Sequence, residues 1–293
     1  RNPHPGQLKI LGVSLWSRSL ELPEWDEFQH VNLKTWEKRK QLVENPAVLH
    51  SIPDWLFERM SSELGDEFLG ILPHLNQTSF LILRANTQKT NLQNLIEKLA
   101  EDNVIAEKLV GTEAGLIVRE RSNVFRTLAF KNGLFEVQDG SSQQVALFLD
   151  VQPGQRVVDT CAGAGGKTLH IADLLKNKGK VVALDIHEWK LDQLKLRARR
   201  NSYSNIERKI IEGTKSIKRL KGTADRLLLD VPCSGLGVLK RNPGTKWKVS
   251  AESLEKLHKT QREILQQYSS ILKVGGLMVY ATCSILPSEN EYQ

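Results

Sequence analysis

The 293-residue sequence lacks the marks of several protein classes. It has no signal-peptide pattern at its N-terminus and no apolar run near the roughly 18 residues of a membrane span. Its three cysteines, Cys161, Cys233 and Cys283, are too few and too widely spaced for a disulfide framework or a metal-ligand cluster. The sequence therefore predicts no metal site, no membrane partner and a reducing, cytoplasmic setting.

Composition is otherwise ordinary, with 40% hydrophobic and 26% charged residues, so the chain can bury a sizeable core. The net charge of +7 is unevenly spread. Residues 195–221 hold ten Lys or Arg and two Glu, and the rest of the chain is about neutral. Such a basic stripe suggests a polyanion, most often nucleic acid, while a solvated helix face is the alternative.

Three regions follow one another along the chain. Residues 1–75 read as helical, with helices over 26–45, from Pro53 to Gly65 and over 69–75, and without a catalytic constellation. Residues 76–135 read as a small α/β unit, either an RNA-recognition-like module or a structural linker. Its expected elements are a strand at 79–84, a helix at 91–101 and strands at 104–105, 116–118 and 124–130.

The third region, 136–293, reads as a doubly wound α/β domain. After a strand and packing helix over 135–148, it has apolar strands without alternation, typical of a parallel sheet covered on both faces. The expected strands are 157–158, 181–184, 210–211, 226–229 and 277–281, with helices at 167–176, 189–201 and 250–272. Ligands bind such sheets at the carboxyl ends of the strands. That rule places Cys161, Asp185, Glu212, residues 230–233 and Thr282-Cys283 along one rim.

A strand, a turn of small residues and a helix follow one another over residues 157–169, V-V-D-T-C-A-G-A-G-G-K-T-L. A P-loop needs Gly where Cys161 stands, and so does a G-x-G-x-x-G dinucleotide fingerprint. The third interpretation is a methyltransferase nucleotide loop, which wraps a cofactor without phosphate. Asp185 ends the next strand about 20 residues on, where ribose recognition requires an acidic group.

Two strand ends each carry a cysteine followed by serine, Cys233 in D-V-P-C-S-G and Cys283 in A-T-C-S. A thiolate is a strong nucleophile. Its addition to carbon 6 of cytosine would put electron density on carbon 5, which splits one difficult methylation into two easier steps. Asp230 is placed to stabilise that adduct at ring nitrogen 3, and a second thiol or water could then remove the carbon 5 proton. The residues alone do not rank the two thiols.

Five motifs over about residues 135–292 carry a family resemblance. They are F-E-V-Q-D-G-S-S-Q, D-T-C-A-G-A-G-G-K-T, A-L-D-I, L-L-L-D-V-P-C-S-G-L-G-V-L-K-R-N-P and Y-A-T-C-S-I-L-P-S-E-N-E. With them the chain resembles the Nop/Sun (Fmu-type) RNA cytosine-5 methyltransferases, especially the bacterial rRNA enzymes. The resemblance implies a Rossmann-like class I methyltransferase domain. It also implies methyl transfer from S-adenosylmethionine to carbon 5 of a cytosine in RNA, with 16S-type rRNA favoured over tRNA.

The resemblance also assigns roles to residues. It makes Cys283 the nucleophile and Cys233 the thiol that assists product release. Asp185 would bind the ribose, Glu212 would contact the adenine side, and Asp230 would lie near the methionine end and the base. The loop that would hold the cofactor consists of Cys161, Ala162, Gly163, Ala164, Gly165, Gly166 and Lys167.

The chain departs from the family pattern at three positions. Ala164 stands where the family usually has Pro, Glu212 where Asp is usual, and Gly244 where an acidic residue is usual. None of these removes a proposed catalytic group. The alternatives are a tRNA methyltransferase, a P-loop NTPase and an inactive RNA-binding ribosome-assembly factor of the same fold. Nothing argues against a monomer.

Both chain ends bear on completeness. The sequence does not start with Met, and it ends at Gln293, before the helix and antiparallel hairpin that usually complete such a sheet. We therefore expect a C-terminally truncated domain with reduced stability or activity relative to a longer form. The N-terminal helical region loosely resembles a NusB-like RNA-binding extension, or it is an accessory scaffold.

Overall fold

The computed structural model describes residues 24, 34–35, 38, 44–120 and 122–293. The chain divides into two units, Arg1–Glu58 and Arg59–Gln293. The helix expected over 26–45 lies almost wholly outside the described residues. The following helices are α3 (Pro46–Leu49), α4 (Asp54–Leu64) and α5 (Glu67–Leu75). As predicted, α4 begins directly after Pro53 and ends before Gly65, whose φ of +57° is the left-handed conformation that closes many helices.

The first sheet is antiparallel, with the strand order β2-β3-β1-β4. Its elements are β1 (Leu81–Ala85), α6 (Leu92–Glu101), β2 (Ala106–Lys108), β3 (Gly115–Val118) and β4 (Phe135–Val137). The amphipathic helix α6 buries Leu95 and Leu99 against the sheet, as its spacing predicted. The expected strand at Phe135 is present as β4, and it pairs with β1 rather than with the parallel sheet. The division of the chain at residue 136 stays a prediction.

The strand predicted at residues 124–130 is wrong. The segment forms a 3₁₀ turn, η2 (Val124–Arg126), and a short helix, α7 (Leu128–Lys131). Thr127 separates the two, and its hydroxyl accepts a hydrogen bond from the Phe130 amide at 3.1 Å. This N-cap stabilises a helix start, and β-branched and aromatic residues therefore do not make a strand here.

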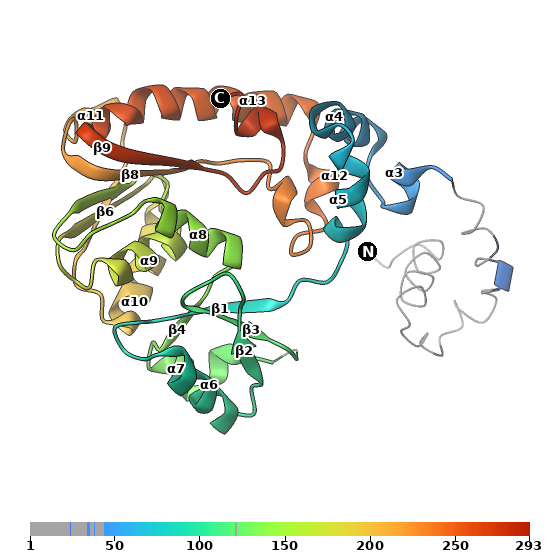
Figure 1. Ribbon diagram of the computed structural model, residues 1–293. Helices are drawn as coiled ribbons and strands as arrows, with labels where there is room; N and C mark the ends of the chain where they lie inside the picture. The colour runs from blue at the N-terminus through green and yellow to red at the C-terminus, as the bar shows by residue number, and fades with distance from the viewer. Residues whose placement is uncertain (1–23, 25–33, 36–37, 39–43, 121) are drawn as a thin grey trace. The chain divides into compact units, whose positions relative to one another are not determined.

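The second sheet is parallel, with the order β7-β6-β5-β8-β9 (Figure 1). Its strands are β5 (Arg156–Asp159), β6 (Lys180–Asp185), β7 (Ile206–Ile210), β8 (Ala224–Asp230) and β9 (Leu272–Ala281). The helices are α8 (Gly140–Phe148), α9 (Gly166–Leu174), α10 (Glu188–Asn201), α11 (Thr214–Lys218), α12 (Thr245–Lys248) and α13 (Ala251–Tyr268). Three 3₁₀ turns complete it, η3 (Leu236–Val238), η4 (Ser269–Ile271) and η5 (Pro287–Glu289). The doubly wound α/β prediction is confirmed.

Helices cover both faces of this sheet. Figure 1 shows α8, α9 and α10 on one face and α11 and α13 on the other. The two neighbours Val157 and Val158 of β5 belong to separate cores, one toward each layer. A strand buried on both faces needs apolar residues at successive positions, which explains its lack of alternation. In the part of the chain that the structure describes, no helix is both long and apolar enough to cross a membrane.

Candidate active site

One cavity of about 540 Å³ opens at the carboxyl ends of the parallel strands. It collects seven of the residues singled out from the sequence: Cys161, Gly163, Lys167, Asp185, Asp230, Cys233 and Cys283. Ala162, Ala164, Gly165 and Gly166 belong to the same loop, and they are not among the lining residues. Glu212 is exposed and does not line the cavity, whereas its neighbour Ile211 does.

The glycine-rich loop, residues 161–167, joins β5 to α9. Gly163 and Gly165 adopt φ of +54° and +89°, conformations that side chains rarely tolerate. At Gly165 a Cβ atom would lie 2.2 Å from Leu194 Cδ1 of α10, so any other residue would have to displace the Leu194 side chain in addition to adopting this φ. The sequence predicted a loop that wraps a ligand, and in the structure this loop also lies close to α10.

Asp185 ends β6, and both of its carboxylate oxygens accept backbone amides. Gly163 N donates to Oδ2 and His187 N donates to Oδ1, each at 2.8 Å. The carboxylate is thereby fixed between the glycine-rich loop and the start of α10. Each oxygen keeps further acceptor capacity toward the cavity, so the group can receive hydroxyl donors from a ligand.

Lys167 and Asp230 meet within the cavity. Lys167 Nζ donates to Asp230 Oδ2 at 2.8 Å, and the two side chains are 17% and 28% exposed. This ion pair joins the glycine-rich loop to the end of β8. It holds the Asp230 carboxylate near the two thiols by a charge-assisted hydrogen bond.

The two cysteine thiols lie side by side although 50 residues separate them. Cys233 Sγ and Cys283 Sγ are 3.2 Å apart, and the Cys283 amide also donates to Cys233 Sγ at 3.2 Å. The hydrogen bond from Cys233 lowers the pKa of the Cys283 thiol. That same contact, together with burial, raises the pKa of Cys233. Cys283 is therefore the readier thiolate of the pair.

The third cysteine is chemically different. Cys161 lines the cavity, but burial raises the pKa of its thiol to about 12. A thiol with such a pKa stays protonated at neutral pH and is a poor nucleophile. The structure thus separates Cys161 from the Cys233–Cys283 pair.

A buried carboxylate supports the loop that carries Cys233. Glu289 is 0% exposed and accepts from the Ser234 amide at 2.8 Å and from the Ser234 hydroxyl. Gln261 of α13 donates to the same carboxylate at 3.0 Å and to the Pro232 carbonyl at 2.9 Å. Glu289 therefore fixes the P-C-S loop through Ser234 and Gln261.

The T-C-S loop is held by neighbouring contacts. The Thr282 hydroxyl donates to Asn290 Oδ1 at 2.6 Å, and Asn290 Nδ2 donates to the Ser284 carbonyl at 3.2 Å. Gly237 N donates to the Cys283 carbonyl at 2.9 Å, which ties this loop to the segment after Cys233. The serines that follow the two cysteines also meet, with their hydroxyl oxygens 3.2 Å apart.

Sequence reasoning did not single out several residues that line the cavity. Ile186, His187 and Lys190 follow Asp185, and Thr260, Glu263, Ile264, Gln267 and Tyr268 come from α13. The helix predicted over residues 250–272 is α13, but no site residue is predicted on it. Its Thr260, Glu263 and Gln267 are three to four residues apart, so they share one helix face. That spacing was the available signal.

Part of the basic stripe is neutralised within the fold. Arg197 and Arg200 pair with Glu136, Arg208 pairs with Asp192, and Lys209 pairs with Glu207. These four cations are paired within the fold, so fewer charges of the stripe are left to attract a polyanion than the sequence suggests. Among the described residues, no three His, Cys, Asp or Glu side chains gather as a metal site would require.

Comparisons with known proteins agree with this geometry. Residues 146–293 match the family described as 16S rRNA methyltransferase RsmB/F, and residues 52–125 match its ferredoxin-like domain. A probable ribosomal RNA small subunit methyltransferase B from Synechocystis sp. is 37% identical over 249 residues, which cover 83% of this chain and 55% of that protein. The chain thus spans about half the length of the curated relatives it matches.

Two solved structures have the same fold. PH0851 aligns with a TM-score of 0.80 at 29% identity and covers 100% of this chain and 68% of that one. NSun6 from Pyrococcus horikoshii, described with SFG, aligns with a TM-score of 0.75 at 21% identity. The latter alignment covers 83% of this chain and 86% of that one. The ferredoxin-like module and the parallel methyltransferase sheet therefore recur together.

Proposed function

The chain belongs to the 16S rRNA methyltransferase RsmB/F family, and from this premise we propose that it methylates carbon 5 of a cytosine in RNA, with rRNA favoured over tRNA. The observation that carries the proposal is the pair of thiols, 3.2 Å apart in the cavity that also holds Asp230 and Lys167. One thiol can attack the base while the other stays protonated beside it.

The cavity residues fit S-adenosylmethionine, which supplies an electrophilic methyl group when bound. Asp185 would accept the ribose hydroxyls, because its fixed carboxylate faces the cavity with acceptor capacity left. The apolar side chains of Ile186, Ile211 and Pro232 line the same cavity and suit an adenine ring. The loop residues 161–167 would contact the rest of the cofactor, and the predicted contact of Glu212 to the adenine side stays a proposal.

Cys283 would be the nucleophile. Its thiolate forms a bond to cytosine carbon 6, and the ring electrons move toward carbon 5 and nitrogen 3. Nitrogen 3 would take up a proton from solvent, the Asp230 carboxylate would accept a hydrogen bond from that N–H, and the proton would return to solvent when the adduct breaks down. Once carbon 5 carries the methyl group, a base removes the carbon 5 proton and the Cys283–carbon 6 bond breaks. Cys233 would assist this release, since it contacts Cys283 directly.

The test is methyl transfer from labelled S-adenosylmethionine to unmodified small-subunit rRNA and to tRNA. We expect label on rRNA cytosine with the wild type, none with Cys283→Ala, and a trapped protein–RNA adduct with Cys233→Ala. We also propose that the enzyme is a monomer and that it acts in the cytoplasm. An active Cys283→Ala beside an inactive, adduct-free Cys233→Ala would exchange the two roles. Label on tRNA alone would show that tRNA, and not rRNA, is the substrate. A folded wild type that binds RNA but transfers no methyl group would favour the inactive ribosome-assembly factor.

A further inference from the structure

Charged residues that do not line the cavity, and that take no part in the proposed reaction, hold the glycine-rich loop. Arg197 of α10 donates from Nη1 to the Ala164 carbonyl at 2.6 Å. Leu194, one turn earlier on α10, lies against Gly165 so closely that a Cβ there would overlap it. The position of α10 therefore sets the path of the loop backbone at Ala164 and Gly165.

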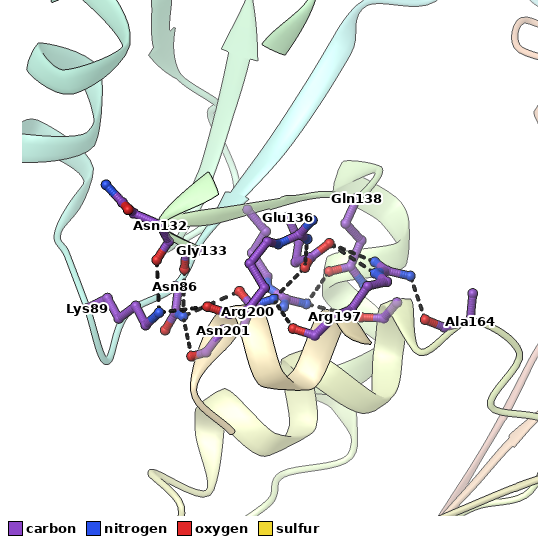
Figure 2. A network of polar contacts seen from close by, with 12 residues as sticks. Asn86, Lys89, Asn132, Gly133, Glu136, Gln138, Ala164, Arg197, Arg200 and Asn201 are labelled. Atoms are coloured by element: carbon purple, nitrogen blue, oxygen red, sulfur yellow. Dashed lines mark hydrogen bonds and ion pairs between the residues drawn. The ribbon is translucent and has the colours of Figure 1, made fainter. Parts of the chain in front are cut away.

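Residues of the antiparallel sheet fix α10 in turn. Glu136 of β4 is 3% exposed and accepts Arg197 Nη2 at 2.8 Å and Arg197 Nε at 3.2 Å. It also accepts hydrogen bonds from Arg200 and Asn201 (Figure 2). One guanidinium thus spans Glu136 and Ala164, so the carboxylate aims Arg197 at the loop.

Residues of the loops beside the antiparallel sheet also hold the C-terminal end of α10. Lys89 Nζ donates to the Arg200 carbonyl at 2.8 Å, and Asn86 Nδ2 donates to the Asn201 carbonyl at 3.0 Å (Figure 2). A Cβ at Gly133 would lie 2.1 Å from the Arg200 carbonyl oxygen, so the two backbones meet without a side chain between them. These contacts satisfy carbonyls that a helix end leaves free.

A second arginine reaches the loop directly. Arg84 of β1 is 1% exposed and donates from Nη1 to the Gly166 carbonyl at 3.2 Å and to Gln138. Its Nε has no hydrogen-bond partner. Neither contact of Nη1 is to a carboxylate, and a buried guanidinium without direct counter-charge is a cost in stability. Its hydrogen bond instead fixes the position of Gly166 at the start of α9.

We propose that Arg197, aimed by Glu136, and Arg84 are positioning residues of the cofactor loop, so that the antiparallel sheet forms part of the cofactor site. This inference rests on the proposed function, in which residues 161–167 contact S-adenosylmethionine. Its consequence is that cofactor affinity depends on residues that do not line the cavity.

The experiment compares Arg197→Lys with Arg208→Lys. Lysine keeps the charge but lacks the fork that reaches two partners. Arg208 is a matched control, because it too joins a backbone carbonyl, that of Leu191 at 3.0 Å, to a carboxylate, that of Asp192 at 2.9 Å. Binding of S-adenosylhomocysteine is measured by calorimetry, and amide hydrogen exchange reports on residues 161–167.

We expect Arg197→Lys to bind S-adenosylhomocysteine roughly tenfold more weakly, with faster exchange in the loop, from loss of one charge-assisted hydrogen bond. Arg208→Lys should match the wild type in both. In the methylation assay, Arg197→Lys should raise the KM for S-adenosylmethionine and leave the KM for RNA unchanged. Equal affinities for all three proteins would overturn the inference, as would equal losses in both variants. A wild type that binds no S-adenosylhomocysteine would instead overturn the proposed function.

Discussion

Two buried carboxylates, Glu136 and Glu289, each hold a different part of the site, and they do so with opposite kinds of partner. Glu136 accepts two guanidinium groups and an amide, whereas Glu289 accepts a backbone amide, a hydroxyl and a side-chain amide. Burial alone would raise the pKa of Glu136, but the charges of Arg197 and Arg200 outweigh it and lower that pKa. At position 136 the surroundings require a negative charge, while at position 289 they require two well-placed polar atoms, one of which must accept hydrogen bonds.

The replacement of glutamate by glutamine at both positions tests this difference, and Glu136→Gln should have the larger effect. It leaves Arg197 and Arg200 without a counter-charge in a mostly buried place. We expect the free energy of unfolding to fall by about 3 kcal/mol, the lower end for a broken buried ion pair. Urea unfolding at pH 7 measures it.

The same pair of proteins has a pH signature. The folded-state pKa of Glu136 lies below its ordinary value of 4.5, so the unfolded state takes up the proton first as pH falls. The advantage of the wild type over Glu136→Gln is thus fully present above 4.5 and is lost as pH falls through the lower folded-state value. A difference that stays constant down to acid pH would mean that packing, not charge, holds this region.

At position 289 the glutamine variant should be mild and the alanine variant severe. Glutamine can keep one oxygen toward the Ser234 amide and Gln261, while its amide donates to the Ser234 hydroxyl, which can reverse its role. We expect a loss within about 1 kcal/mol for Glu289→Gln and about 2–3 kcal/mol for Glu289→Ala, because alanine removes the carboxylate that the Ser234 amide, the Ser234 hydroxyl and the Gln261 amide donate to.

Methylation rates should follow the same order as stability at this position, since the carboxylate holds the loop that carries Cys233. A Glu289→Gln variant as unstable as Glu289→Ala would show that this site too requires charge. The contrast with Glu136 would then fail.

The sequence predicted four of the five parallel strands well, because continuous apolar runs such as V-V-A-L have few alternatives to a strand buried on both faces. The strand predicted at 210–211 overlaps β7 only at Ile210, because most of β7, I-E-R-K-I, is not an apolar run. The prediction failed at residues 124–130, where one N-cap at Thr127 outweighed strand propensity. The rim residues also followed from topology, since parallel strands bring their carboxyl ends to one edge.

The two supporting carboxylates could not be found in this way. Both stand in motifs that carry the family resemblance, F-E-V-Q-D-G and S-E-N-E, but a motif does not name a partner. Glu136 pairs with a residue 61 positions away and Glu289 with one 55 positions away. Only the folded chain brings these groups together, so their roles are a property of tertiary structure.

For the thiol pair we expect a smaller effect, which measures how far the contact with Cys233 changes the pKa of Cys283. The hydrogen bond from Cys233 lowers the pKa of Cys283, so Cys233→Ala should raise it toward its ordinary value of 9.0. Alkylation of Cys283 by iodoacetamide, followed against pH without RNA, should shift its midpoint upward by less than two pH units, roughly the shift of one hydrogen bond to a charged group. Cys161 should stay unmodified, because burial raises its pKa to about 12. An unchanged midpoint would place the activation of Cys283 elsewhere, with Lys167 the next group to test.

The smallest effect is expected where a carboxylate meets an arginine at the surface. Asp192 pairs with Arg208 at 2.9 Å, a geometry like that of Glu136 with Arg197, but its side chain is 62% exposed. Water solvates both partners when the pair is broken, so Asp192→Asn should change the free energy of unfolding by less than about 0.5 kcal/mol. Since the distances match while burial and the number of partners do not, the gap between Asp192→Asn and Glu136→Gln measures what burial and the second guanidinium add together. If Asp192→Asn cost as much as Glu136→Gln, the network around Glu136 would owe nothing to its burial, and its control of the cofactor loop would have to come from geometry alone.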